Sequence, residues 1–254
     1  MPIAVSDLAI APVKGLRLVQ MDELDIRPTG PVGDRAFVVV DERHALMQTT
    51  RTPALLQVAQ RWNHESGELT LRFPDGSEVA EVPSPDQPIS TGLYDGRQVS
   101  GRLVPGPHSE ALSGHLNRRA WLVALDQSEV GADEFPVSLM STASLAGLGQ
   151  ALDGTAPDPR RFRMSITVDG AGAWEEHGWA GSEVDVGEVR VRIVEPVPRC
   201  VVTTRDPDEG RSDVPVLKAL AALRGKKDVT FGVWCEVTHP GRVRRGDPVM
   251  PPGG

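Results

Sequence analysis

The sequence predicts a mainly β protein with a few helices, an α+β chain with a β-barrel-like core. Two hairpin patterns support this prediction. Residues 69–73 and 78–82 flank a turn that contains Pro and Gly, and residues 184–186 and 189–193 flank Gly187-Glu188. Alternating apolar and polar side chains on both sides of such turns are typical of antiparallel strands. The third observation is that helical spacing of apolar residues occurs in only a few short segments.

Two further runs, residues 35–40 and 163–168, are expected to form strands, and the first is apolar enough to be buried. Loops are expected at residues 83–88, which hold three prolines, and at residues 126–136. The second loop separates two strand-rich halves. We therefore predict one strand-rich domain over residues 1–125 and a second over residues 126–254.

Helices are predicted in three places. Residues 141–152 carry leucines at helical spacing, with Ser141 as a candidate N-cap. Residues 216–223 form a second apolar pattern, and Gly225 follows it at a position that suits a C-cap. Residues 109–116 form a third and weaker pattern.

Composition excludes several classes of protein. The 254 residues include 27 Lys and Arg against 35 Asp and Glu, a net charge of −8, which argues against a nucleic-acid partner. No apolar run approaches the length of a membrane span, and the N-terminal residues lack the pattern of a signal peptide. Two cysteines do not make a secreted disulfide framework. We expect a cytoplasmic protein with no membrane partner.

Cys200 is the first residue that could carry chemistry. It lies beside Arg199 at the end of a strand-like run, and a neighbouring guanidinium favours the thiolate, which is the nucleophile and the metal ligand. A buried inert thiol is the alternative, and the residues alone leave it open. Cys235 has no adjacent cation and is expected in the core. The sequence has no CxxC pair, no GxSxG and no Walker loop, so zinc, a serine hydrolase and a nucleotide loop are not predicted.

Several cations lie at the ends of predicted strands or among Gly and hydroxyl residues. Arginine offers a planar fork for phosphate and lysine a point charge, so such cations suit an anionic ligand. Each one alone also fits a solvated surface charge, and only their convergence would make an anion site. Ser141 and Ser144 fit either anion binding at a helix start or simple capping. The cations are Lys14, Arg35, Arg51, Arg160, Arg161 and Arg163.

Seven segments, in the order in which they occur along the chain, resemble the motifs of one protein superfamily. In the first half they are residues 11–15, 33–39 and 48–56, and in the second half residues 141–145, 162–163, 199–210 and 231–249. The most specific is Arg199-Cys200 with the following Thr-Thr and Asp-Pro pairs, together with Gly246-Asp247-Pro248-Val249. Nearly the whole chain therefore resembles the MOSC superfamily, named for the molybdenum cofactor sulfurase C-terminal domain, with its N-terminal β-barrel domain. The branch that it resembles most holds the mitochondrial amidoxime-reducing components and their bacterial relatives.

The resemblance implies a molybdenum cofactor, Mo-molybdopterin, and a MOSC-type β-barrel core. Cys200 falls on the position of the metal-ligating and catalytic cysteine, and a soft thiolate suits a sulfur-rich metal centre. Asp133 falls on a position near the cofactor and is a second catalytic candidate, for a proton or a positioning role. The residues expected to bind the cofactor are Lys14, Gly15, Arg35, Arg51, Ser141, Ser144, Arg163, Arg199 and Trp234.

The implied function is that of a molybdenum-dependent oxidoreductase, which removes oxygen from small N-hydroxylated substrates. Its electrons would come from a separate redox protein, since no second redox centre is visible in the sequence. Two alternatives remain: a non-catalytic carrier of the cofactor or of its sulfur, and an interaction domain with a degenerate site. Five residues depart from the family's pattern, and these departures affect the substrate pocket more than metal binding: Gly15, Glu134, Phe135, Pro198 and Met164.

Overall fold

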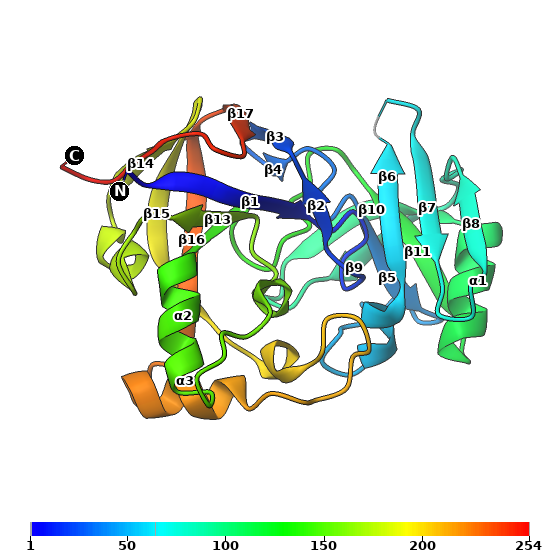
Figure 1. Ribbon diagram of the computed structural model, residues 1–254. Helices are drawn as coiled ribbons and strands as arrows, with labels where there is room; N and C mark the ends of the chain where they lie inside the picture. The colour runs from blue at the N-terminus through cyan, green and yellow to red at the C-terminus, as the bar shows by residue number, and fades with distance from the viewer. Residues whose placement is uncertain (1, 64, 254) are drawn as a thin grey trace.

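The computed structural model describes residues 2–63 and 65–253 of the chain (Figure 1). Strands dominate it and a few short helices lie at the edges, so the predicted fold class is confirmed. The largest sheet has eight strands in the order β18-β14-β15-β16-β12-β13-β1-β2. These strands are β1 (Ala4–Ile10), β2 (Val19–Met21), β12 (Val137–Ser141), β13 (Ile166–Asp169), β14 (Glu183–Val186), β15 (Val189–Pro198), β16 (Thr230–His239) and β18 (Val249–Met250).

The eight-stranded sheet curls until the β18 segment, at one end, meets β1, the second strand from the other end. Val5 N donates to Asp247 O at 2.9 Å, and Val249 N donates to Ile3 O at 2.9 Å, so β1 also contacts the segment that contains β18. This contact brings both chain ends to one side of the molecule (Figure 1). Because hydrogen bonds join the ends, the sheet forms a barrel, which removes most of its free edges.

Three smaller sheets complete the β structure. One has the order β5-β11-β10-β9, one β17-β3-β4 and one β6-β7-β8. Their strands are β3 (Glu23–Arg27), β4 (Gly30–Pro31), β5 (Phe37–Asp41), β6 (Ala59–Asn63), β7 (Glu68–Arg72), β8 (Glu78–Glu81), β9 (Pro88–Gly92), β10 (Gln98–Val104), β11 (Ala120–Leu125) and β17 (Gly241–Arg244).

The predicted helices are confirmed with small shifts at their ends. They are α1 (Pro107–Leu116), α2 (Thr142–Gln150) and α3 (Val216–Arg224). The Ser141 hydroxyl caps α2 by accepting a hydrogen bond from Ser144 N, as predicted. Four short 3-10 helices join the strands: η1 (Pro53–Gln57), η2 (Pro159–Phe162), η3 (Glu175–Trp179) and η4 (Val201–Thr204).

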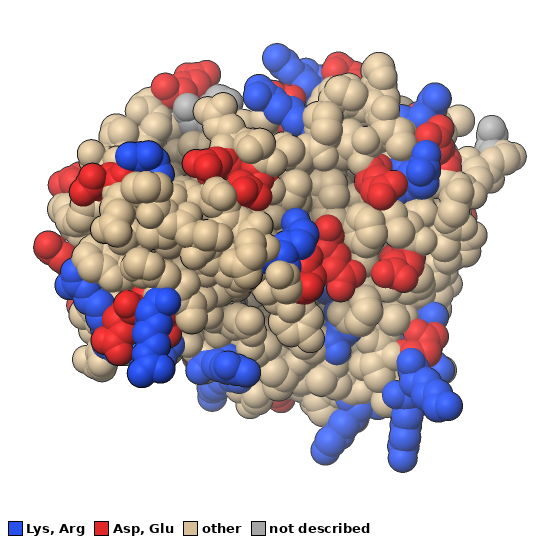
Figure 2. Space-filling model, turned by 180° about the vertical axis from the view of Figure 1, so that it is seen from behind, with Lys and Arg blue, Asp and Glu red and all other residues tan. Residues whose placement is uncertain are grey.

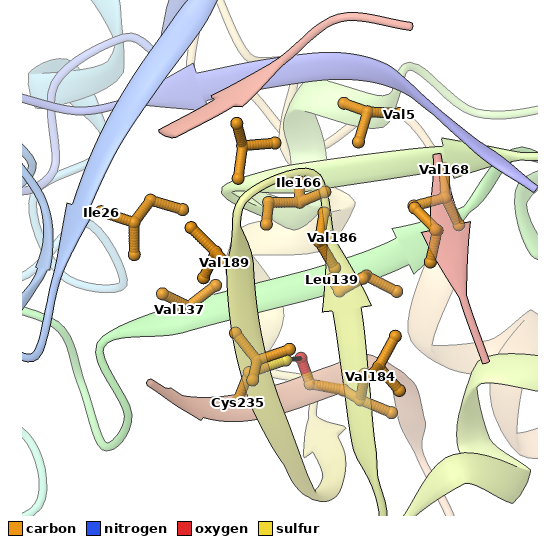
Figure 3. Packing of buried hydrophobic residues seen from close by; sticks show 14 of the residues in the cluster. Val5, Ile26, Val137, Leu139, Ile166, Val168, Val184, Val186, Val189 and Cys235 are labelled. Carbon is orange, nitrogen blue, oxygen red and sulfur yellow. Dashed lines mark hydrogen bonds between the residues drawn. The ribbon is translucent and has the colours of Figure 1, made fainter. Parts of the chain in front are cut away.

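The interior of the barrel is filled by β-branched and other aliphatic side chains. Figure 3 shows Val137 and Leu139 of β12, Val184 and Val186 of β14, and Cys235 of β16 directed into this core. Alternating strand residues supply it, which is why the 184–193 hairpin pattern was visible in the sequence. A second core under α1 joins the sheets that contain β5 and β7, and a third lies between the barrel and helices α2 and α3.

Both predicted hairpins are present, as β7–β8 and β14–β15. Two strand predictions need correction at their first residues. Arg35 precedes β5, and Arg163 follows η2 rather than opening a strand, with the strand starting at Ile166. The reason at the second site is that Pro159 follows Asp158, whose carboxylate accepts from Arg160 N, and this cap starts a helical turn.

The chain crosses between the two predicted domains. Residues 126–136 form a loop without a named element, as expected, but β1 and β2 at the start of the chain pair within the barrel of the second half. β3 likewise pairs with β17 near the C-terminus. A boundary at residues 125 and 126 stays a prediction, and the barrel draws strands from both sides of it.

Charged side chains are mixed on the surface. Figure 2 shows acidic and basic groups beside one another on that face of the molecule. Several are ion pairs between strands, such as Arg190 with Asp185 and Arg244 with Glu23. Exposed pairs of this kind contribute roughly 0–1 kcal/mol each to stability. Exposed charges of this kind are ordinary, so the cations that call for a functional explanation are those with little exposed surface.

Candidate functional site

A cavity of about 250 Å³ lies where segments from both halves of the chain meet. Loop residues after β1, before β5 and before β12 form part of its wall, together with η2 and the end of β15. Residues 46–50, η4 and β16 also contribute to it. Eight of the predicted site residues line it: Lys14, Gly15, Arg35, Asp133, Arg163, Arg199, Cys200 and Trp234. Most of the cations that the sequence named as candidates for an anion site therefore do meet at one cavity.

Lys14 and Asp133 form an ion pair across this wall. Lys14 Nζ lies 2.7 Å from Asp133 Oδ1 and also donates to Gly131 O at 2.8 Å. Burial lowers the pKa of Lys14 below its ordinary value, and Asp133 acts against that shift. Burial pushes the pKa of Asp133 upward, but Lys14, Arg35 and Arg163 outweigh it, so the net shift is downward. Asp133 is therefore ionised at neutral pH and acts as a partner of Lys14.

Gly15 lets the chain turn sharply after Lys14. Its φ is +91°, a left-handed value that favours glycine, and an added Cβ would lie 3.0 Å from Thr49 Oγ1. The backbone of Lys14 is fixed as well, because Lys14 N donates to Phe37 O at 2.8 Å. The turn therefore holds the Lys14 side chain at the cavity.

Arg35 and Arg163 both have left-handed backbones, with φ of +50° and +55°. Such values are uncommon for non-glycine residues and are found mainly where the surroundings enforce them. The two residues are also joined, since Arg35 Nη2 donates to Arg163 O at 3.3 Å. Arg35 forms an ion pair with Asp34, and Arg163 Nη2 donates to Leu16 O at 2.8 Å. The strained backbone thus aims two guanidinium groups at one cavity.

Arg199 is held by main-chain carbonyls beside the exposed thiol of Cys200. Its Nε donates to Phe231 O at 2.9 Å, and its Nη1 donates to Phe162 O at 2.9 Å. Cys200 itself forms the N-cap of η4, directly after Arg199, and Thr203 Oγ1 donates to its carbonyl. The end of β15 therefore presents a thiol and a buried cation side by side.

Two of these cations are charged groups without a carboxylate partner in the part of the chain that the structure describes. Burial lowers the pKa of Arg199 to about 9 and that of Arg163 to about 10. Both remain protonated at neutral pH, and their solvation by carbonyls alone is incomplete. The cavity wall therefore holds uncompensated positive charge, which an anionic ligand would neutralise.

Known protein families match both halves of the chain. Residues 126–250 match the MOSC domain, and residues 3–102 match the MOSC N-terminal beta barrel domain. The amidoxime-reducing component 1 of Homo sapiens, a mitochondrial protein, is 31% identical over 96% of this chain and 82% of its own length. The chain belongs to the MOSC family.

More distant relatives of this MOSC protein agree. The mitochondrial amidoxime-reducing component 1 of Mus musculus is 25% identical over 96% of this chain and 81% of its own length. The molybdenum cofactor sulfurase of Homo sapiens is 21% identical over 98% of this chain, which corresponds to 32% of that longer protein. The names of these relatives concern amidoxime reduction and the molybdenum cofactor.

Three predicted cofactor-binding residues of the MOSC chain do not line the cavity: Arg51, Ser141 and Ser144. Arg51 is exposed in the loop before η1. The two serine hydroxyls are fully buried and donate to Glu176 Oε2, at 3.0 Å from Ser141 and 2.9 Å from Ser144. Both hydroxyls are used inside the fold: Ser141 caps α2, and Ser144 also accepts from Trp174 N at 2.8 Å.

Cys235 is buried in the barrel core, as predicted, and burial raises the pKa of its thiol. Among residues 2–63 and 65–253, no three His, Cys, Asp or Glu side chains gather as a metal site. A metal held at Cys200 would therefore need most of its ligands from a cofactor. In the same ranges, no helix combines the length and the apolar character that a membrane span requires.

Two further residues of the cavity wall were outside the set expected to bind the cofactor. Arg161, one of the candidate cations of the sequence, lines the cavity while forming a bidentate ion pair with Asp213, at 2.7 and 2.8 Å. Tyr94, on the turn between β9 and β10, also lines it and is 67% exposed. The sequence missed Tyr94, because a hairpin far along the chain brings it to the cavity and no local pattern marks it.

Proposed function

We propose that this MOSC protein is a molybdenum-cofactor-dependent reductase of small N-hydroxylated compounds. One observation carries the proposal: the exposed thiol of Cys200 shares a cavity with the partly buried cations Lys14, Arg35, Arg163 and Arg199. A pterin cofactor with a phosphate and a sulfur-bound metal needs this combination. Cationic groups would hold the anionic parts, and a soft thiolate would complete the ligands of the metal.

The residues present fit the cofactor on their own chemistry. Arg163 and Arg199 are solvated by main-chain carbonyls and have no described carboxylate partner, so a bound phosphate or other anion would supply the missing charge. Lys14 is already paired with Asp133 and also donates to Gly131 O, so it is better suited to one hydrogen bond from its third proton. Cys200 would be the one protein ligand to the metal.

When bound, the cofactor supplies a two-electron metal centre for removal of oxygen from an N–OH group. The overall reaction consumes two electrons and two protons and releases water together with the reduced nitrogen compound. A separate redox protein would supply the electrons. The ionised state of Asp133 favours its positioning role, since a carboxylate that is already deprotonated holds Lys14 in place and has no proton to give.

Molybdenum content tests the proposal. Protein purified from a host that makes the cofactor is expected to contain near-stoichiometric molybdenum by elemental mass spectrometry, and Cys200→Ser is expected to lose it. Cys235→Ser is the matched control, because this thiol is buried in the barrel and does not line the cavity. A metal-loaded Cys200→Ser that is fully active on a hydroxylamine with a chemical reductant would refute the assigned role.

A carrier of the cofactor or of its sulfur is the second candidate. The exposure of Cys200 favours it, because a thiol open to solvent is also accessible to a partner protein, and one relative is named a molybdenum cofactor sulfurase. Turnover distinguishes the two functions. A carrier would bind molybdenum and fail to reduce a hydroxylamine with a chemical reductant, whereas a reductase would turn over.

A further inference from the structure

Lysine side chains gather on the outer face of α3 and in the turn that follows it. Three of the four lysines of the chain, Lys218, Lys226 and Lys227, lie there, and all three are exposed. Residues 214–227 include Arg224 as a fourth cation and no acidic residue, on a chain whose net charge is −8. Figure 2 shows basic side chains projecting at the lower right, the side on which the half turn from Figure 1 places α3. We call the three lysines the α3 lysine surface.

The opposite face of α3 packs against the wall of the cavity. Val216 and Leu220 are buried in the third core together with Val197, which lines the cavity. α3 also contacts η4, the 3-10 helix that begins directly after Cys200. Because an α-helix with its side chains is roughly 10 Å across, a molecule bound on the α3 lysine surface lies about one helix diameter from the cavity.

The three lysines have no use within the fold. In the part of the chain that the structure describes, none of them forms an ion pair, whereas Arg224 pairs with Asp228 at 2.8 Å. Two of the five large apolar side chains that are exposed in the same part belong to the contacting elements, Leu223 to α3 and Val201 to η4. Apolar groups among unpaired charges of one sign are typical of a small protein–protein interface.

We propose that the α3 lysine surface docks an acidic one-electron redox protein, which supplies the electrons of the reaction. The proposal rests on the proposed function, in which reduction of an N–OH group takes two electrons and two protons and releases water. Two donor molecules are therefore oxidised in each turnover, and each must bind, transfer its electron and leave.

The charge of the surface suits this kind of encounter. An acidic partner is repelled by a chain of net charge −8 except where cations gather, so the lysines would direct it to α3. Attraction between opposite charges speeds association more than it tightens binding, and the interfaces of redox complexes are small. The exposed lysines beside η4 therefore favour fast docking and fast release near Cys200.

Binding of a small acidic ferredoxin, an iron–sulfur protein that carries one electron, tests the proposal. Its dissociation constant is measured by calorimetry at low and at high salt on the full chain, purified from a host that makes the cofactor. One variant combines Lys226→Glu with Lys227→Glu, and a milder one combines Lys226→Gln with Lys227→Gln. The matched control combines Arg61→Glu with Arg102→Glu, which changes the net charge equally at exposed positions of β6 and β10.

The parent is expected to bind the ferredoxin at low salt and more weakly at high salt. The glutamate pair at the lysines is expected to weaken binding by about tenfold and the glutamine pair by less, while the arginine control stays close to the parent. No binding by the parent, an unchanged constant in the glutamate pair, or equal weakening in the control would each overturn the proposal. Binding to phosphatidylglycerol vesicles that the glutamate pair loses, with ferredoxin binding unchanged, would assign the surface to a membrane instead.

Turnover of a hydroxylamine separates this proposal from the proposed function. With reduced ferredoxin at low concentration, the glutamate pair is expected to be about tenfold slower than the parent, in proportion to the weaker binding. With a chemical reductant, and in molybdenum content, the two proteins are expected to be equal, because neither lysine lines the cavity. A parent that holds no molybdenum or fails with the chemical reductant would refute the proposed function, and equal rates of the two proteins with ferredoxin would refute the docking surface.

Discussion

Replacement of Arg163 by glycine is predicted to stabilise the metal-free protein and to impair cofactor binding. The side chain is a partly buried cation with no described carboxylate partner, on a backbone with φ of +55°. Glycine adopts that φ without strain and carries no charge. The substitution therefore removes two costs in the folded state and, with them, one of the groups proposed to hold the cofactor.

The magnitude follows from four contributions. Left-handed backbone costs a non-glycine residue roughly 1–2 kcal/mol. Burial lowers the pKa of Arg163 from its ordinary value to about 10, which corresponds to about 3 kcal/mol. We keep about half of it, because the side chain is partly open to the cavity. Against these stand about 1 kcal/mol for the hydrogen bond to Leu16 O and about 1 kcal/mol for the greater unfolded-state entropy of glycine.

The net stabilisation is about 1 kcal/mol, or roughly 2–4 °C in melting temperature for a chain of this size. Urea unfolding of metal-free protein measures it. Arg163→Ala removes the charge, keeps the backbone strain and avoids the entropy cost of glycine, so it should be about 0.5 kcal/mol less stable than Arg163→Gly. Asn117→Gly, at another left-handed position away from the cavity wall, should leave molybdenum content unchanged. A glycine variant that is less stable than the parent, or that keeps its full molybdenum content, would refute this reasoning.

Two further predictions concern pH and the cavity loop. Burial lowers the pKa of His177 to about 4, so the contribution of this neutral side chain to the free energy of unfolding is complete above pH 6.5 and declines as the pH falls toward 4. After allowance for partial exposure, the free energy of unfolding, measured with urea along an acid titration, should fall by about 1–2 kcal/mol more in the parent than in His177→Phe. Equal slopes in the two proteins would contradict this. Arg97 donates to three carbonyls of the loop, those of Val130, Ala132 and Asp133. Arg97→Ala should therefore speed amide exchange in residues 130–134 by about tenfold while the barrel amides stay unchanged, and unchanged loop exchange would show that other contacts suffice.

Local patterns predicted the elements well because each is determined by neighbouring residues. The turn residues between residues 69 and 82, and the capping serine before α2, act within a few positions of the chain. The left-handed turns at Arg35 and Arg163 could not be predicted in this way. Arg35 N donates to Ala11 O at 2.9 Å, a contact from another part of the chain that fixes a conformation its own sequence does not favour.

The candidate site, too, could be predicted only in part from local sequence. The resemblance predicted four of its cations, Lys14, Arg35, Arg163 and Arg199, but their convergence, and the position of Arg51 outside the cavity, needed the fold. Ser141 and Ser144 show the reverse case, since the residue that takes their hydroxyls, Glu176, is 35 and 32 positions away. A polar motif at a helix start fits a ligand or a cap equally well, and only a distant partner decides between them.

The position of the cavity explains why its residues are spread along the whole chain. Lys14 follows the strand that completes the barrel, Arg35 precedes a strand of the smaller sheet, and Arg199 ends a barrel strand. Neither half of the chain carries this set of cations alone, so holding the two halves together is part of building the site. The left-handed backbones of Arg35 and Arg163 and the buried charge of Arg199 each reduce stability by themselves. Costs of this kind, gathered at one cavity beside an exposed thiol, are expected where binding an anion has taken precedence over the stability of the unliganded chain.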